Sequence, residues 1–92
     1  MTTTGLPLQD ATVSAVQAEM LHAVAKHGHD MTVLSPTMLD TTKLVVLVEE
    51  VGEVARAMTY DNGDRGQLVR ELLQVAAVAA GWAQALDQWG TD

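Results

Sequence analysis

The chain has 92 residues and a mass of 9.8 kDa, which is the size of one domain with a single hydrophobic core. Hydrophobic residues make up 48% and charged residues 18%, a composition that excludes both a wholly disordered chain and a membrane-embedded one. The net charge is -7, from 12 acidic and 5 basic residues, and no cluster of Lys or Arg could follow a phosphate backbone. We therefore expect no nucleic-acid partner.

The chain contains no cysteine, which excludes disulfides, thiolate metal sites and cysteine nucleophiles and favours a cytoplasmic location. Residues 1–8 lack the basic and apolar regions of a signal peptide, and we expect them to form a flexible tail. The most apolar stretch, residues 72–86, is too short to cross a bilayer of about 30 Å. The sequence therefore predicts one helical domain over residues 9–90 without a membrane partner.

Three segments show helical spacing of apolar residues, and breaks that contain glycine or proline separate them. The spacing predicts helices over residues 9–27, 37–60 and 65–89. No segment alternates between apolar and polar residues as a strand does. The expected fold class is all-α, an antiparallel helical bundle of about three main helices.

The expected helix ends depend on a few residues with known capping preferences. Ser35 is a candidate cap for the second helix, with Pro36 in its first turn. Asp64 is a candidate cap for the third helix, and Gly90 suits its end. An Asn62-Gly63 turn would return the third helix antiparallel to the second.

The second and third helices carry apolar stripes that we expect to form the core. These stripes comprise Leu44, Leu47, Val48, Val51, Ala55 and Met58 on the second helix, and Leu68, Leu72, Val75, Ala79, Trp82 and Leu86 on the third. Further apolar residues, such as Val46, Val54, Ala57 and Ala77, lie outside the stripes, and three helices are too few to cover them. We therefore expect a homodimer or tetramer to complete the bundle, the alternative being a monomeric three-helix bundle.

Acidic residues are concentrated on the second helix, at Glu49, Glu50 and Glu53, and Glu71 and Gln74 repeat the three-residue spacing on the third. Like charges at helical spacings repel, so the cluster costs stability unless a cation neutralises it. Carboxylate oxygens from two facing helices suit Mg²⁺ or Mn²⁺. A solvated acidic face is the alternative interpretation.

Two runs of sequence, KLVVLVEEVGEVARAM from Lys43 to Met58 and ELLQVAAVAAGWAQAL from Glu71 to Leu86, resemble the MazG-like all-α nucleoside triphosphate pyrophosphohydrolase family. That family's pattern is Glu-Glu-x-x-Glu on one helix and Glu-x-x-Asp on the next. Glu71 matches the start of the second motif, but Gln74 stands where the family has Asp. The first motif is matched in full, by Glu49, Glu50 and Glu53.

The resemblance implies an Mg²⁺-dependent enzyme that hydrolyses a (deoxy)nucleoside triphosphate to the monophosphate and pyrophosphate. It implies that Glu49 orients the attacking water or acts as its base, and that Glu50, Glu53 and Glu71 hold the metal. Gln74 either coordinates the metal directly or hydrogen-bonds a neighbouring ligand. An amide is a weaker ligand than a carboxylate, so we expect weakened metal binding. The alternative function is a catalytically weakened nucleotide-binding or helical protein-interaction module.

Phosphate binding and base recognition need further residues. The basic residues near the motifs include Lys43 and Arg70, which are candidates for binding substrate phosphate. Trp82 lies on the apolar stripe of the third helix, which favours a core or interface role over base stacking. The spacing of His22 and His27 is wrong for one helix face, so we expect no zinc site there.

Overall fold

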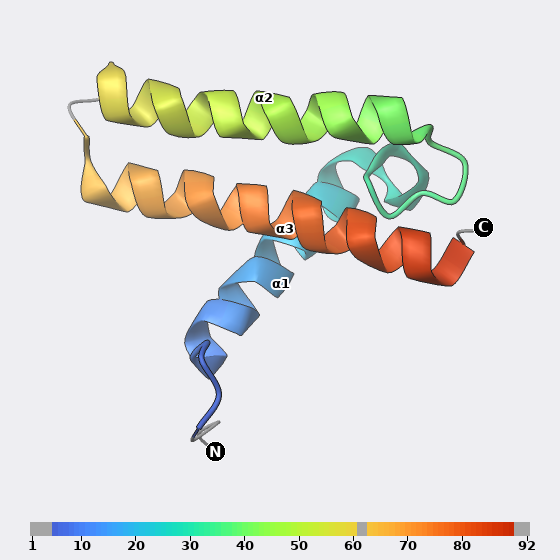
Figure 1. Cartoon of the computed structure of the whole chain (residues 1–92), viewed down its shortest axis with the longest axis horizontal. Helices are drawn as coiled ribbons and strands as arrows, with labels where there is room; N and C mark the ends of the chain where they lie inside the picture. Colours follow the sequence, from blue (N-terminus) through green and yellow to red (C-terminus); the bar gives the residue numbers. More distant parts are fainter. Residues whose placement is uncertain (1–4, 61–62, 90–92) are drawn as a thin grey trace.

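The computed structural model describes residues 5–60 and 63–89, and this part of the chain is all-helical, as predicted (Figure 1). Three α-helices, α1 (Asp10–His27), α2 (Asp40–Thr59) and α3 (Arg65–Trp89), and a short 3-10 helix, η1 (His29–Met31), contain most of it. The described residues include no strand and no helix that is both long and apolar enough to span a membrane. Of the expected N-terminal tail, residues 5–8 are exposed and non-helical, and residues 1–4 lie outside the described part.

The predicted bounds are correct for α3 and within one residue for α1. Asp64 caps α3 as expected, because its Oδ1 accepts the backbone N–H of Gln67 at 3.0 Å. Gly63 before it has φ +66°, a left-handed conformation that glycine adopts without strain. Gly90 and Asn62 lie outside the described residues.

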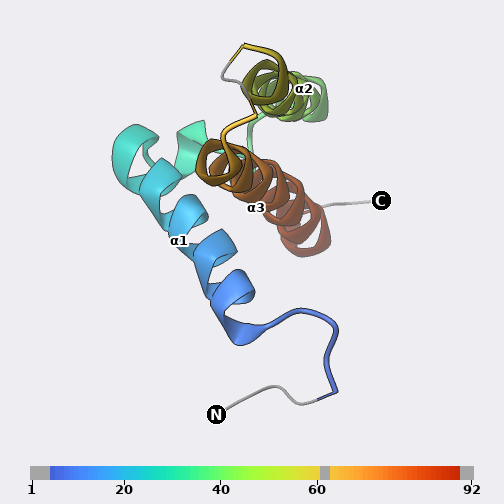
Figure 2. The same cartoon turned by 90° about the vertical axis from the view of Figure 1, so that its left-hand side faces the viewer.

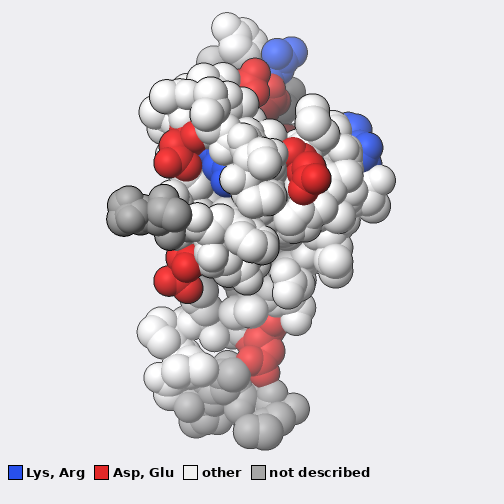
Figure 3. Space-filling model, turned by 90° about the vertical axis from the view of Figure 1, so that its right-hand side faces the viewer, with Lys and Arg blue, Asp and Glu red and all other residues white. Residues whose placement is uncertain are grey.

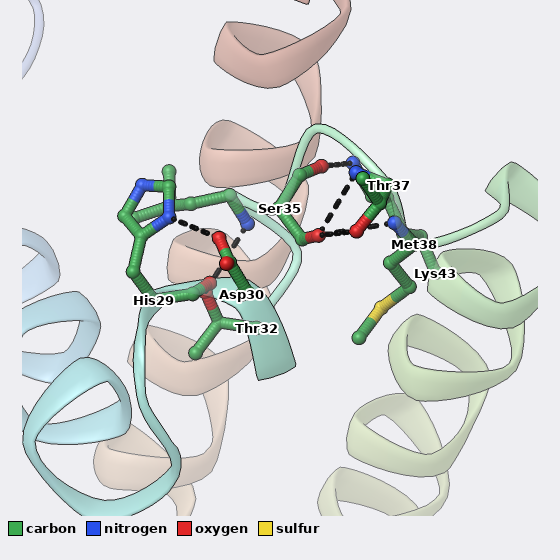
Figure 4. Close-up of polar contacts among 8 residues, drawn as sticks. His29, Asp30, Thr32, Ser35, Thr37, Met38 and Lys43 are labelled. Atoms are coloured by element: carbon green, nitrogen blue, oxygen red, sulfur yellow. Dashed lines mark hydrogen bonds and ion pairs between the residues drawn. The ribbon is translucent and has the colours of Figure 1, made fainter.

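The prediction is wrong for the start of α2, which begins at Asp40, three residues later than expected. The Ser35 side chain caps a separate turn, since its Oγ accepts the backbone N–H groups of Thr37 and Met38 at 3.0 Å each (Figure 4). Leu39 is then extended, and α2 starts after it without a side-chain cap. The hydrogen bonds that Ser35 accepts therefore stabilise a separate turn, and α2 begins only after this turn.

α3 is the central helix of the fold. α2 lies beside it and antiparallel to it, whereas α1 crosses its other side obliquely instead of completing an antiparallel bundle (Figures 1 and 2). In the described part of the chain, α1 and α2 make no backbone-level contact with each other. α3 thus separates them, and only side chains can bridge the space between them.

Small residues form the packed surfaces around α3. Ala57, Ala77 and Ala85 are buried, as is Gly81. A Cβ added at Gly81 would lie 2.8 Å from Met20 Sδ and 3.0 Å from a Val33 methyl group. The absence of a side chain at this position allows α3 to approach α1 and the following loop closely.

The expectation that the two long apolar stripes form the core is wrong for most of their members. On α2 and α3 they are about half exposed or more, as at Leu44, Val48, Val51, Met58, Leu72 and Leu86. We call these six residues the outer face. Leu72 lies nine residues from Gly81, which is about 180° around α3, so the outer face points away from the α1 contact.

Substituting Gly81 by Ala tests the close approach of α3 to α1. Overpacking typically costs about 1–3 kcal/mol, and we expect Gly81→Ala to lower the melting temperature in a thermal unfolding experiment. Gly52→Ala is the matched control, because Gly52 is also helical but no atom lies within 4 Å of an added Cβ. The control should gain about 0.5–1 kcal/mol from helix propensity. Equal effects of the two substitutions would contradict the packing described.

Candidate metal and nucleotide site

A cavity of about 280 Å³ lies between α1 and α2, with α3 as its floor. It exists because α1 and α2 flank α3 and make no backbone-level contact with each other. One part of its wall is apolar, and another carries ionisable groups from α1 and α2 together with the amide of Gln74 on α3. The lining residues used below are Glu19, Met20, His22, Lys26, Val33, Val46, Glu50, Gln74 and Val78.

Gln74 joins acidic residues of two helices at the wall of this cavity. Its amide nitrogen donates hydrogen bonds to Glu50 Oε2 at 2.8 Å and to Glu71 Oε1 at 3.1 Å. The opposite amide orientation would turn the oxygen towards two carboxylates, so hydrogen bonding selects this one. The structure brings three of the predicted ligands, Glu50, Glu71 and Gln74, together, but Gln74 donates hydrogen bonds to the two carboxylates and does not turn its oxygen towards them.

Glu71 is a buried carboxylate, 8% exposed, that two amides hold on α3. Gln67 Nε2 donates to Glu71 Oε2 at 2.7 Å, and Gln74 donates to the other oxygen. Arg70 acts on Glu71 only indirectly, since its Nη2 donates to Gln67 Oε1 at 2.6 Å. No Lys, Arg or His in residues 5–60 and 63–89 forms an ion pair with Glu71. Hydrogen bonds to amides therefore compensate its burial.

Glu50 is the electrostatic centre of the acidic cluster. Burial raises its pKa above the ordinary value of 4.5, and the charges of Glu71, Glu53, Glu49 and Glu19 raise it further, in that order. The ionised carboxylate is therefore less favourable here than in water. A bound cation would remove this penalty, which is the electrostatic condition for a metal site.

Glu49 and Glu53 lie beside Glu50 on α2 but remain exposed. In the described residues, no group of three or more His, Asp or Glu side chains is close enough to hold a metal ion. The oxygen ligands brought together are thus the carboxylates of Glu50 and Glu71, whereas Gln74 presents its amide N–H groups to both of them. Mg²⁺ is commonly held by one or two carboxylates together with waters and substrate phosphates. These ligands fit a metal ion that is also coordinated by a phosphate group and by water. They are too few for a site in which the protein supplies every ligand.

Neither of the two residues expected to bind substrate phosphate, Lys43 and Arg70, lines this cavity. Lys43 is only 4% exposed, and its Nζ donates to the Ser35 carbonyl at 2.8 Å (Figure 4). It lines a more open cavity where α2 begins, at an end of the molecule whose surface is mostly uncharged (Figure 3). Arg70 is exposed and bonded to Gln67.

α1 supplies site residues that the sequence reasoning missed. Glu19, His22 and Lys26 all line the cavity opposite Glu50. Their spacing of three and four residues places them on one face of the helix, and this was the signal that could have found them. Lys26 is the basic residue of α1 that faces the acidic cluster across this space.

Trp82 does not line the cavity, in agreement with the expected packing role. Its indole Nε1 donates to Asp40 Oδ1 at 2.9 Å, which joins α3 to the first turn of α2. The apolar part of the cavity wall is formed by aliphatic side chains and a methionine instead, such as Met20, Val33 and Val78.

Comparison of the chain with known protein families, characterised proteins and solved structures finds no match.

The raised pKa of Glu50 makes a testable contribution to stability. Below pH 4.5 Glu50 is neutral in both states, and its unfavourable effect on folding develops as the pH rises through the raised pKa. Without divalent cations, we expect Glu50→Gln to raise the melting temperature by a few degrees at pH 7 and by much less at pH 4. Glu49→Gln, at an exposed neighbouring position, is the control and should change little. A pH-independent gain would show that charge is not the cause.

Proposed function

We propose that the protein is an Mg²⁺-dependent nucleotide pyrophosphohydrolase, which cleaves a (deoxy)nucleoside triphosphate to the monophosphate and pyrophosphate. The observation that carries this proposal is the convergence of Glu50 and Glu71 on one amide nitrogen at the wall of a cavity. Two desolvated carboxylates from facing helices are suited to share a cation with phosphate oxygens. The Glu-Glu-x-x-Glu motif and its resemblance to the MazG-like family support the same activity.

In this proposal, Glu50 and Glu71 would hold the Mg²⁺, with Glu53 one turn along α2 as a further ligand. Gln74 would add its oxygen as a weaker ligand only after its amide turns over, because its nitrogen faces the two carboxylates in the metal-free protein. A cation held by these residues would neutralise phosphate charge and lower the pKa of a coordinated water. Glu49 orients the attacking water or accepts its proton from the exposed side of α2. Mn²⁺ can replace Mg²⁺ because it favours the same oxygen ligands.

The cavity offers different surroundings to the two ends of the substrate, an apolar wall for the base and charged side chains for the phosphates. At about 280 Å³, it can take a base or sugar but not a whole triphosphate. Its apolar wall, with Met20, Val33 and Val78, suits the base, because methionine adapts to flat and polarizable partners. Lys26 lies on the same cavity and supplies a positive charge for phosphate oxygens, in place of the buried Lys43.

One observation favours the alternative of a nucleotide-binding or helical interaction module without catalysis. The Gln74 amide already satisfies an oxygen of Glu50 and one of Glu71, so the fold meets their hydrogen-bonding needs without a metal. In either case we propose a homodimer or tetramer, because so much apolar surface remains exposed on α2 and α3.

The enzymatic proposal predicts Mg²⁺-dependent release of pyrophosphate from at least one member of a panel of ribo- and deoxyribonucleoside triphosphates. Glu71→Gln should reduce this release by about 100-fold or more, because it removes a charged metal ligand. Asp87→Asn removes an exposed carboxylate from the same helix and serves as the control. A wild-type protein that releases no pyrophosphate with Mg²⁺ or Mn²⁺ across the panel would exclude catalysis.

The role of Gln74 has its own test, in which the family residue is restored. Gln74→Asp replaces a neutral donor by a third carboxylate, so we expect Mg²⁺ to bind about tenfold more tightly by calorimetry. The variant should also be less stable than the wild type without metal and gain more from Mg²⁺ in a thermal unfolding experiment. Unchanged affinity would place Gln74 outside the metal site.

A further inference from the structure

We propose that Lys43 is a positioning residue for the candidate site, because its buried ammonium group holds a loop that forms one wall of the cavity. The loop comprises residues 32–38, between η1 and α2. By fixing this wall, Lys43 sets how tightly the cavity holds the nucleoside part of the substrate, without touching it. This inference rests on the part of the proposed function that places the base in the cavity, and it is independent of the catalytic part.

The loop is buried, which is unusual for a connection between helices. Thr32, Val33 and Ser35 are only 6%, 2% and 0% exposed, whereas the whole of α1 contains no buried residue. Connecting loops usually run over the surface, because buried N–H and C=O groups outside a helix have no regular partner. This loop therefore needs specific side chains to satisfy its backbone and to hold it against the helices.

Two side chains of the loop itself fix its internal shape. The Thr32 hydroxyl donates to the His29 carbonyl at 2.8 Å and accepts the backbone N–H of Leu34 at 3.3 Å. The Ser35 hydroxyl accepts two further backbone N–H groups. These hydrogen bonds span at most three residues, so they shape the loop but do not attach it to an α-helix.

Lys43, in the first turn of α2, supplies the attachment. Its Nζ donates to the Ser35 carbonyl at 2.8 Å (Figure 4), and in residues 5–60 and 63–89 this is the only hydrogen bond between the loop and an α-helix. Lys43 is 4% exposed and forms no ion pair in the same residues, so its charge is costly to bury. An apolar side chain would avoid this cost, but it would leave the Ser35 carbonyl buried without a partner.

The loop separates Lys43 from the candidate site. Thr32, Val33 and Met38 line the cavity of the site, whereas Ser35 and Lys43 line the more open cavity where α2 begins. Met38 lines both cavities, so the loop is a thin partition between them. A shift of the loop at the Ser35 carbonyl therefore changes the wall that a bound base would contact.

Loss of the hydrogen bond from Lys43 should weaken ligand binding more than it affects the chemical step. Without this donor, the buried carbonyl recovers a partner only if the loop opens and water enters. The free protein tolerates an open loop, whereas the complex needs the wall in one position, so the ordering cost is added to binding. The carboxylates of Glu50 and Glu71 lie on α2 and α3 and stay in place.

Lys43→Met tests this role, because methionine is a long side chain without a donor. In calorimetry without metal, we expect the best-bound of five nucleosides, adenosine, guanosine, cytidine, uridine and thymidine, to bind about tenfold more weakly than to the wild type. For the corresponding triphosphate, KM should rise about tenfold and kcat should stay within about twofold. Lys43→Arg keeps a donor and should restore nucleoside affinity to within about threefold.

Asp64→Ala is the matched control for lost stability. It removes the cap of α3 at the end of that helix far from the loop (Figure 1), so it should lower the melting temperature and leave nucleoside affinity unchanged. Equal losses of affinity in Lys43→Met and Asp64→Ala would overturn the proposal. A Lys43→Met protein that is less stable but binds nucleoside as the wild type does would overturn it as well, since Lys43 would then be purely structural.

The wild-type protein gives a second test, which does not need a variant to fold. Saturation with the best-bound nucleoside should shift the amide NMR signals of Thr32, Val33 and Met38, because these residues line the cavity. Unchanged signals at all three, with shifted signals on α1 such as that of Met20, would show that the loop is not the wall the ligand contacts. That result would also refute the role of Lys43.

The nucleoside measurements separate this inference from the catalytic proposal. Weaker nucleoside binding to Lys43→Met, in a protein whose wild type releases no pyrophosphate, would support the role of Lys43 and refute catalysis. A wild-type protein that releases pyrophosphate but binds no nucleoside at millimolar concentration would refute the position of the base and, with it, this inference.

Discussion

The close approach of α3 to its neighbours is the constraint on which the other features of this structure depend. Gly81 meets Met20 and Val33 at distances that leave no room for a side chain, and Ala57 and Ala77 are buried in the packed surfaces around α3. Helices that meet through small residues bury little apolar area, however close they come. The large aliphatic side chains are therefore left on the opposite side of the α2–α3 pair.

The same close packing explains the acidic cluster. Because α2 and α3 lie side by side and antiparallel, Glu50 and Glu71 are brought within reach of a single amide nitrogen of Gln74. Two carboxylates in a partly desolvated place repel, and amide donors reduce this cost without removing the charge. The raised pKa of Glu50 is the remaining part of that cost, and it is also what makes the cluster attractive to a cation.

α3 has a neighbouring helix on two of its sides and an exposed apolar surface on the third. One side holds α1 and the floor of the cavity, another faces α2 and the acidic cluster, and the third carries exposed leucines such as Leu72 and Leu86. Because two sides of α3 are packed against other helices and the third is apolar, little of its surface is polar. This agrees with the low charged fraction of the chain. The candidate site and the exposed apolar residues therefore lie on different sides of α3.

The sequence by itself determined the three helices, the Asp64 cap and the convergence of Glu50, Glu71 and Gln74, because these depend on local spacing and on one short antiparallel connection. Only the tertiary structure decided which apolar face turns inward, since periodicity identifies a stripe but not the surface that covers it. It also decided the late start of α2, where the hydrogen bonds of Ser35 compete with the helix, and the burial of Lys43 against that turn. The contribution of α1 to the cavity likewise depends on contacts between segments far apart in the chain, which no local pattern encodes.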